Sequence, residues 1–209
     1  MCARCCPGNE VKAFKNLESA AAPFLQPNID TDQIIPARFL QKPRSGGFGQ
    51  YLFHDLRFDM NGAERPEFAL NQPHHRDARV VVANVNFGCG SSRENAVWAL
   101  SDYGFEVVIA PSFGDIFHTN CVKNGLLPIR LPEAVVGDLL ARVSETPDLA
   151  IRVDLEAQTV ALPDGSTHSF EIDPFAKYCL INGFDELDYT LSHRDEIAAF
   201  ENRYGREND

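Results

Sequence analysis

The residues best suited to chemistry lie close together between positions 86 and 100, where the sequence reads NFGCGSSRENAVWAL. Two glycines, a cysteine, two serines and an arginine occupy positions 88–93. A set of this kind is compatible with a phosphate cradle, a cysteine nucleophile, a metal site or an anion-binding site. The spacing of the residues decides among these sites only in part.

A phosphate cradle fits the spacing poorly. No lysine follows the second glycine, as a P-loop requires, and Arg93 stands where a dinucleotide-binding motif has its third glycine. A nucleophilic Cys89 would need a histidine and an orienting amide or carboxylate. The six histidines, at positions 54, 74, 75, 118, 168 and 193, show no local signature of such a pair.

An anion-binding site agrees with the residue types. The stretch follows an apolar run and leads into a predicted helix, and the free N–H groups at a helix N-terminus attract anions. Arg93 adds a fork that can hold a carboxylate with two hydrogen bonds, and Ser91 and Ser92 add hydroxyl groups. The alternative is that both serines only cap the helix and Arg93 is a surface charge. These residues alone leave both interpretations open.

The elements around this stretch alternate between strand and helix. The pattern predicts strands at 78–87, 105–110 and 126–131, and helices at 91–102, 112–125 and 132–145. Ser91 or Ser92 is the predicted N-cap of the first helix, Gly125 closes the second, and Pro132 is the first residue of the third. Strands and helices that alternate in this way indicate an α/β fold with a mostly parallel central sheet.

The ends of the chain have a different character. Residues 150–172 alternate around Asp164-Gly165, a strong hairpin signal, and predict an antiparallel β element. Residues 192–205 predict a C-terminal surface helix docked on the body, with Ser192 and Asp195 as a capping box and Ile197, Phe200 and Tyr204 on one face. Residues 1–22 are interpreted as a loosely held leader, disordered over 1–9, and the glycine-rich loop 41–50 as mobile. The whole chain, 1–209, is expected to form one domain.

Composition narrows the classes of partner. The 209 residues are 44% hydrophobic and 23% charged, with a net charge of −11 and a pI near 4.9, so nucleic acid and anionic membranes are unexpected partners. No apolar run approaches the roughly 20 residues of a membrane span, and the N-terminus has no signal-peptide core, so we expect a cytoplasmic protein. Cys2 and Cys5 form a CxxC that could begin a metal site, but no second ligand pair follows.

Several long segments resemble one known family. They are NIDTDQIIPARFL at 28–40, GFGQYLFHDLRF at 47–58, the run from Asn86 to Ile129, DLEAQTVAL at 154–162 and INGFDELDYTLSHRDEIAAFE at 181–201. Together they resemble the small subunits of 3-isopropylmalate dehydratase, the swivel-domain half of the aconitase superfamily, over residues 10–204. The resemblance implies a swivelling β/β/α three-layer domain.

The resemblance also implies an activity and a role for each site residue. The family is a hydro-lyase of leucine biosynthesis that interconverts 2-isopropylmalate and 3-isopropylmalate by reversible dehydration. Matched by motif position, Ser91 is the catalytic base, and Ser92 and Arg93 contact a substrate carboxylate. Asp32 and Thr31 belong to the same site, with Asp30 beside them, although an Asx turn also explains Asp30. Arg44 matches a second carboxylate-binding arginine, with Arg38 or Lys42 as alternatives.

The family further implies a partner. Its 4Fe-4S cluster is bound by a large subunit, so this chain is expected to bind no metal itself and to act only in a heterodimer, and Cys89 is interpreted as a packing residue. Asn95 and Val97 depart from the usual motif, which leaves open the small subunit of a sibling hydro-lyase for homoaconitate, citraconate, citramalate or methylmalate. A non-catalytic anion-binding module is the third interpretation.

Overall fold

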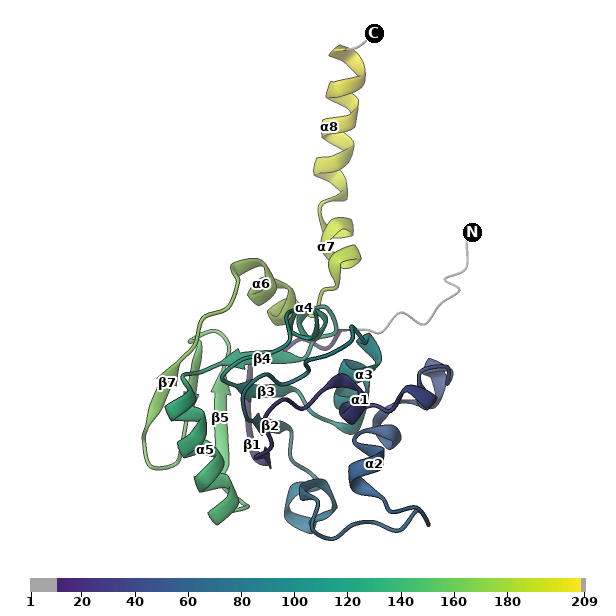
Figure 1. Ribbon diagram of the computed structural model, residues 1–209. Helices are drawn as coiled ribbons and strands as arrows, with labels where there is room; N and C mark the ends of the chain where they lie inside the picture. The colour runs from purple at the N-terminus through teal and green to yellow at the C-terminus, as the bar shows by residue number, and fades with distance from the viewer. Residues whose placement is uncertain (1–10, 208–209) are drawn as a thin grey trace.

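The computed structural model describes residues 11–207, with side chains as far as Tyr204 (Figure 1). Its strands are β1 (Asn16–Phe24), β2 (Val80–Ala83), β3 (Val107–Ala110), β4 (Leu127–Arg130), β5 (Ala150–Asp154), β6 (Thr159–Ala161) and β7 (Thr167–Ser169). Its helices are α1 (Thr31–Ile34), α2 (His54–Arg57), α3 (Glu94–Tyr103), α4 (Asp115–Lys123), α5 (Glu133–Glu145), α6 (Pro174–Asn182), α7 (Glu186–Ser192) and α8 (Arg194–Glu207). Short 3-10 helices cover Ala37–Phe39, Arg44–Gly46, Gly49–Tyr51, Ala69–Asn71 and Pro73–His75.

The described strands form one continuous sheet in the order β4-β3-β2-β1-β5-β6-β7. Strands β1 to β4 are parallel, whereas β5, β6 and β7 continue from β1 in antiparallel pairings. The first half of β1, Asn16–Ala20, pairs with β5, and the second half, Ala21–Phe24, pairs with β2. The predicted α/β class, with a parallel sheet and an antiparallel β element, is therefore confirmed.

Strand β1 was not predicted. The interpretation of residues 16–22 as part of a loosely held leader is wrong, because β1 occupies the middle of the sheet. Its sequence, NLESAAAPF, is rich in alanine and has few of the β-branched or aromatic residues that favour strands. Ala21 and Ala22 are nevertheless fully buried, because neighbours cover both faces of the strand. The predicted disordered leader at 1–9, with Cys2, Cys5 and Cys6, lies outside the described residues.

Two apolar cores lie on the two faces of the parallel sheet. Val81 and Val108 face a core that includes α3, α4 and the N-terminal loops. Val80 and Val82 face a second core that includes α5 and the antiparallel strands. Figure 1 shows α5 on one side of the sheet and α1, α2 and α3 on the other. Strand β2 is thus buried on both faces, which explains its unbroken apolar sequence.

The C-terminal helix differs from its prediction in two ways. It begins at Arg194 instead of Ser192, because Ser192 ends α7 and its hydroxyl donates to the carbonyl of Tyr189 at 2.6 Å. It also projects away from the sheet (Figure 1), so the predicted docking on the body is wrong. Within residues 11–207, no helix is both long and apolar enough to cross a membrane.

Candidate functional site

A tight turn joins β2 to α3 and carries the residues singled out in the sequence. Strand β2 ends at Ala83, four residues earlier than predicted, and Asn86, Gly88 and Gly90 then adopt positive φ angles of 62°, 70° and 89°. Phe87 pins the turn to the segment after β3, because its N–H donates to Ser112 at 3.1 Å and its carbonyl accepts from Gly114 at 3.0 Å. These two hydrogen bonds hold the turn against the segment that follows β3, the parallel neighbour of β2.

Gly88 has no room for a side chain. A Cβ atom at this position would lie 2.2 Å from the ring of Phe117, which covers the turn from α4. The φ angle of 70° is also unfavourable for any residue with a Cβ atom. The glycine is thus required both by the backbone conformation and by the close approach of an aromatic ring.

The start of α1 lies alongside this turn. The N–H of Gly88 donates to Ile29 at 2.8 Å, and the N–H of Thr31 donates to Cys89 at 3.0 Å. The hydroxyl of Thr31, a residue only 2% exposed, donates to the carbonyl of Ser91 at 2.7 Å. Asp30 caps α1, because its carboxylate accepts from Gln33 N–H at 2.7 Å. The structure therefore agrees with the alternative given for Asp30, a local turn-forming role. These contacts bring residues 29–32 and 88–93 into one site.

Arg93 occupies the N-cap position of α3 and is largely enclosed. Its Nη1 forms an ion pair with Asp32 and lies 3.4 Å from the carbonyl oxygen of Ile35. The Arg93 side chain is 15% exposed, whereas that of Asp32 is 54% exposed. Within residues 11–207 its Nε and Nη2 have no hydrogen-bond partner. That edge of the guanidinium keeps the two parallel donors that suit a carboxylate.

Both serines are exposed at the N-terminus of α3. The predicted capping is wrong, because α3 begins at Glu94 and no side chain caps it. Neither serine hydroxyl forms a hydrogen bond within the described part of the chain. Ser91 and Ser92 therefore stand at the positive end of a ten-residue helix with uncommitted hydroxyl groups.

Arg44 lies elsewhere in this structure. Its guanidinium forms an ion pair with Asp102, in the last turn of α3, and stands 5.0 Å from the ring centre of Trp98. Asp102 follows Glu94 by eight residues, so the two ends of α3 are separated by roughly 12 Å at 1.5 Å per residue. The structure thus does not bring Arg44 together with Ser91. Of the alternatives, Arg38 forms an ion pair with Asp55, and Lys42 is exposed.

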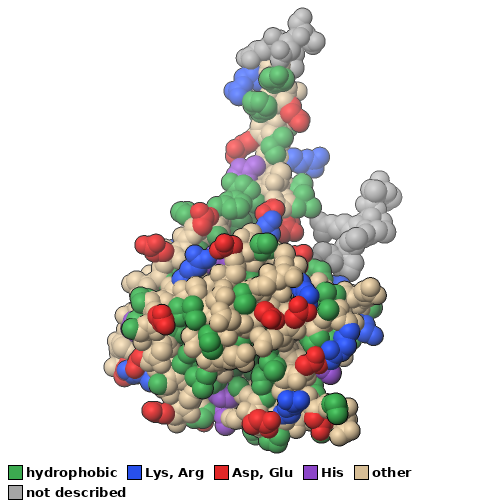
Figure 2. Space-filling model, viewed as in Figure 1, with side chains coloured by type: hydrophobic (Ala, Val, Ile, Leu, Met, Phe, Trp, Pro, Cys, Tyr) green, Lys and Arg blue, Asp and Glu red, His purple; other side chains and the backbone are tan. Residues whose placement is uncertain are grey.

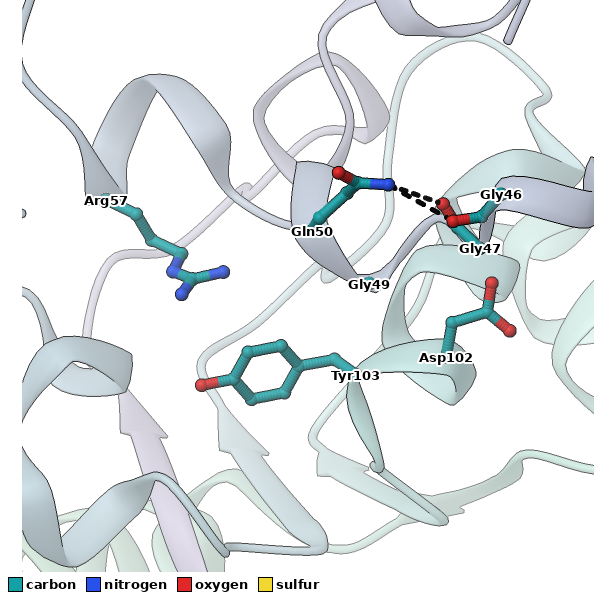
Figure 3. A pocket seen from close by; sticks show the side chains of 7 residues that line it. All are labelled: Gly46, Gly47, Gly49, Gln50, Arg57, Asp102 and Tyr103. Carbon is teal, nitrogen blue, oxygen red and sulfur yellow. Dashed lines mark hydrogen bonds between the residues drawn. The ribbon is translucent and has the colours of Figure 1, made fainter. Parts of the chain in front are cut away.

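The loop around Arg44 forms a separate hollow of about 340 Å³, shown in Figure 3. Arg57 and Asp102 lie at its two ends with Tyr103 between them, and Gln50 donates to the carbonyls of Gly46 and Gly47 (Figure 3). A Cβ atom on Gly49 would lie 2.7 Å from the backbone of Asp102, so the loop rests directly on α3. The loop predicted to be mobile is therefore folded against the end of α3 opposite Ser91.

The described cysteines do not form a metal site. Burial, with a smaller contribution from the Asp30 carboxylate, raises the pKa of the Cys89 thiol, and burial raises the pKa of Cys179 and, well above its usual range, that of Cys121. No group of three or more His, Cys, Asp or Glu residues suited to a metal occurs within residues 11–207. Because iron–sulfur clusters are held by several thiolates, the residues of this part of the chain do not fit such a cluster.

Asn124 is a positioning residue that the sequence pattern does not predict. Its side-chain amide donates to Glu94 Oε1 at 3.0 Å and its carbonyl oxygen accepts from Trp98 Nε1 at 2.9 Å. It thereby ties the first turn of α3, directly after Arg93, to the end of α4. Its place before Gly125 marks only a helix end, so nothing in the sequence indicated this role.

Replacing Thr31 with valine is expected to destabilise the fold by roughly 1–2 kcal/mol, because the shape is kept while the buried hydrogen bond to Ser91 is lost. Urea unfolding, followed by circular dichroism, measures this difference in the free energy of unfolding. Thr31→Ser keeps the hydroxyl and is the control, with a smaller expected loss. If the valine variant were as stable as the wild type, the hydroxyl would not be fixing the turn.

A family match over more than half of the chain assigns this α/β domain, with its serines and enclosed arginine at the N-terminus of α3, to the class of aconitase-like domains. The family described as Aconitase C-terminal domain matches residues 11–134, and a second family, described as LeuD_N, matches residues 138–174. A crystal structure of 3-isopropylmalate dehydratase from Methanocaldococcus jannaschii is similar, with a TM-score of 0.64 and 26% identity over 89% of this chain and 99% of that one.

Relatives with much higher identity specify the family. The 3-isopropylmalate dehydratase small subunit of Rhodospirillum centenum is 52% identical, over 92% of this chain and 95% of the relative. The same subunit of Geobacillus kaustophilus is 50% identical, over 93% of this chain and 98% of the relative. The chain belongs to the family of 3-isopropylmalate dehydratase small subunits, which confirms the resemblance seen in the sequence.

Proposed function

We propose that this chain is the small subunit of a 3-isopropylmalate dehydratase, a hydro-lyase that interconverts 2-isopropylmalate and 3-isopropylmalate in leucine biosynthesis. Membership of the family supports the reaction. The observation that carries the assignment to these residues is the pairing of two uncommitted serine hydroxyls with the free edge of Arg93 at the N-terminus of α3. The protein would act in the cytoplasm on a small hydroxy-dicarboxylate.

In this proposal Ser91 handles the proton. Dehydration of a 2-hydroxy acid requires a base that removes a proton from the carbon next to a carboxylate, and rehydration requires the same group to return it. A serine hydroxyl is a weak base, so its alkoxide form needs strong stabilisation. The positive end of α3 and the nearby guanidinium of Arg93 both favour negative charge at this place.

Arg93 and Ser92 hold a substrate carboxylate. The Nε and Nη2 edge of Arg93 can donate two parallel hydrogen bonds, while Nη1 remains on Asp32, which fixes the orientation of the guanidinium. Thr31 is assigned a positioning role, since its hydroxyl already donates to the carbonyl of Ser91 and its side chain is buried. Arg44 is retained as the second carboxylate contact, and to serve there it would have to leave Asp102.

The other half of the chemistry is assigned to a large partner subunit in a heterodimer. The departing hydroxyl needs an acid or a metal, and the described residues of this chain do not fit the 4Fe-4S cluster of the superfamily. Bound on the large subunit, such a cluster would supply a Lewis acid for that hydroxyl. This chain contributes the base, the carboxylate clamp and their orientation.

Reconstitution with the large subunit tests the proposed function. The purified chain alone is expected to show no turnover, and the mixture is expected to interconvert the two isopropylmalates. Assays with citraconate and homoaconitate examine the sibling activities that Asn95 and Val97 left open. Turnover by the chain alone, or turnover of a sibling substrate in place of isopropylmalate, would contradict the proposal.

A further inference from the structure

The two last helices form a C-terminal arm, α7 and α8, with unusual apolar exposure. Figure 1 shows the arm projecting from the body, and Figure 2 shows hydrophobic side chains along it. Five large apolar residues are 41–63% exposed: Leu187, Leu191, Ile197, Phe200 and Tyr204. Exposed apolar residues that cluster on one element, as these do, mark an interaction surface.

Helical spacing gathers these residues into stripes. Leu187 and Leu191 are four residues apart on α7, whereas Tyr189 lies on its other face and packs against Phe175 and Tyr178 of α6. On α8, the spacing of Ile197, Phe200 and Tyr204 places them on one face, and the last two rings stack 5.9 Å apart. The arm is therefore anchored on one face of α7, and Leu187, Leu191, Ile197 and Phe200 expose large apolar side chains to solvent.

A relay of side-chain contacts links the base of the arm to the start of α3. Glu94, the residue after Arg93, accepts from Asn124 at 3.0 Å. Lys123, the residue before Asn124, forms an ion pair of 2.9 Å with Glu186, the first residue of α7. The connection from Arg93 to the arm thus passes through two direct side-chain contacts. A protein that covers Ser91 and Arg93 approaches the arm as well.

We propose that the C-terminal arm docks into an apolar groove of the large subunit that completes the active site, an inference that rests on the proposed function. Its stripe of i, i+3 and i+7 residues on α8 has the spacing of a helix that binds in a groove. A second copy of this chain fits less well, because residues 186–204 carry five acidic and two basic side chains and the whole chain has a net charge of −11.

The test is to place one charge on each apolar stripe. The Leu191→Asp/Phe200→Asp double variant is expected to raise the Kd for the large subunit by about 30-fold or more, because centrally buried apolar and aromatic residues dominate interface energies. At saturating large subunit its kcat is expected to recover, since the arm holds none of the proposed catalytic residues. Asn202→Asp is the control for charge on α8, because it adds one negative charge on the opposite face, as Phe200→Asp adds one on the apolar face, and it is expected to leave the Kd unchanged.

Three measurements distinguish the possible results of this test: the Kd from titration calorimetry, kcat and the thermal unfolding curve. A folded double variant that binds and turns over like the wild type overturns the arm proposal and leaves the proposed function standing. Wild-type chain that never binds the large subunit overturns both. Wild-type chain that forms a homodimer through the arm, lost in the double variant, assigns the surface to a second copy and also overturns the arm proposal.

Discussion

Replacing Ser91 with alanine is expected to lower kcat of the reconstituted enzyme by about 10²- to 10⁴-fold, the usual contribution of a positioned acid–base group. Ser91 is exposed and its hydroxyl has no partner within residues 11–207, so the free energy of unfolding is expected to change by less than about 0.5 kcal/mol. Binding of the large subunit should also persist. Steady-state kinetics, with urea unfolding and calorimetry on the same preparations, measures the three quantities.

Ser92→Ala is the matched control for this prediction. Ser92 is the neighbouring exposed serine and is assigned to the substrate carboxylate, so its loss is expected to raise KM more than it lowers kcat. A Ser91→Ala enzyme that keeps wild-type kcat would refute the assignment of Ser91 as the base. A Ser92→Ala enzyme with the larger loss of kcat would transfer that role to the second serine.

Gly88→Ala is expected to destabilise the fold by about 3 kcal/mol or more, since overpacking and an unfavourable positive φ each cost about 1–3 kcal/mol. The new methyl group would lie 2.2 Å from the Phe117 ring, which has to move together with α4 or push the turn away. Because that turn carries Ser91 and Arg93, the remaining folded protein is expected to lose activity too. Urea unfolding and kcat/KM measure the two effects.

Gly137→Ala controls for the general effect of replacing a glycine. Gly137 lies on the exposed side of α5, and a Cβ atom there would have no neighbour within 4 Å. This substitution is expected to stabilise the protein by about 0.5–1 kcal/mol, since alanine favours helices more than glycine does. Equal stability of Gly88→Ala and wild type would show that Phe117 and the turn adapt at little cost.

The sequence predicted the parts of the fold whose residues repeat regularly. Strands β2, β3 and β4 are buried apolar runs, and α5 carries buried residues at helical spacing, so each was recognised with errors of a few residues at its ends. Strand β1 was missed because alanine has a low strand propensity, and because its pairing partners on β5 lie up to 138 residues away in the sequence. Long-range pairing of this kind has no local signature.

The candidate site was likewise predictable only in part. Family resemblance placed Ser91, Arg93, Thr31 and Asp32, and the structure brings their segments together. Their individual contacts could not be predicted, because the Thr31 hydroxyl and the Asp32 carboxylate meet partners about 60 residues away. Sequence spacing did not predict the position of Arg44, since an ion pair with Asp102 holds it at the other end of α3.

The position of β1 has a consequence for how the chain acquires its structure. Residues 16–24 are synthesised before both of their pairing partners, residues 80–83 on one side and 150–154 on the other. Strand β1 cannot pair with its second neighbour until residues 150–154 have been made, and until then this alanine-rich strand of low strand propensity is unpaired along one edge. Folding dominated by such distant pairings is slow. During this period the nascent chain exposes the unpaired edges of its central strands, and unpaired strand edges promote aggregation.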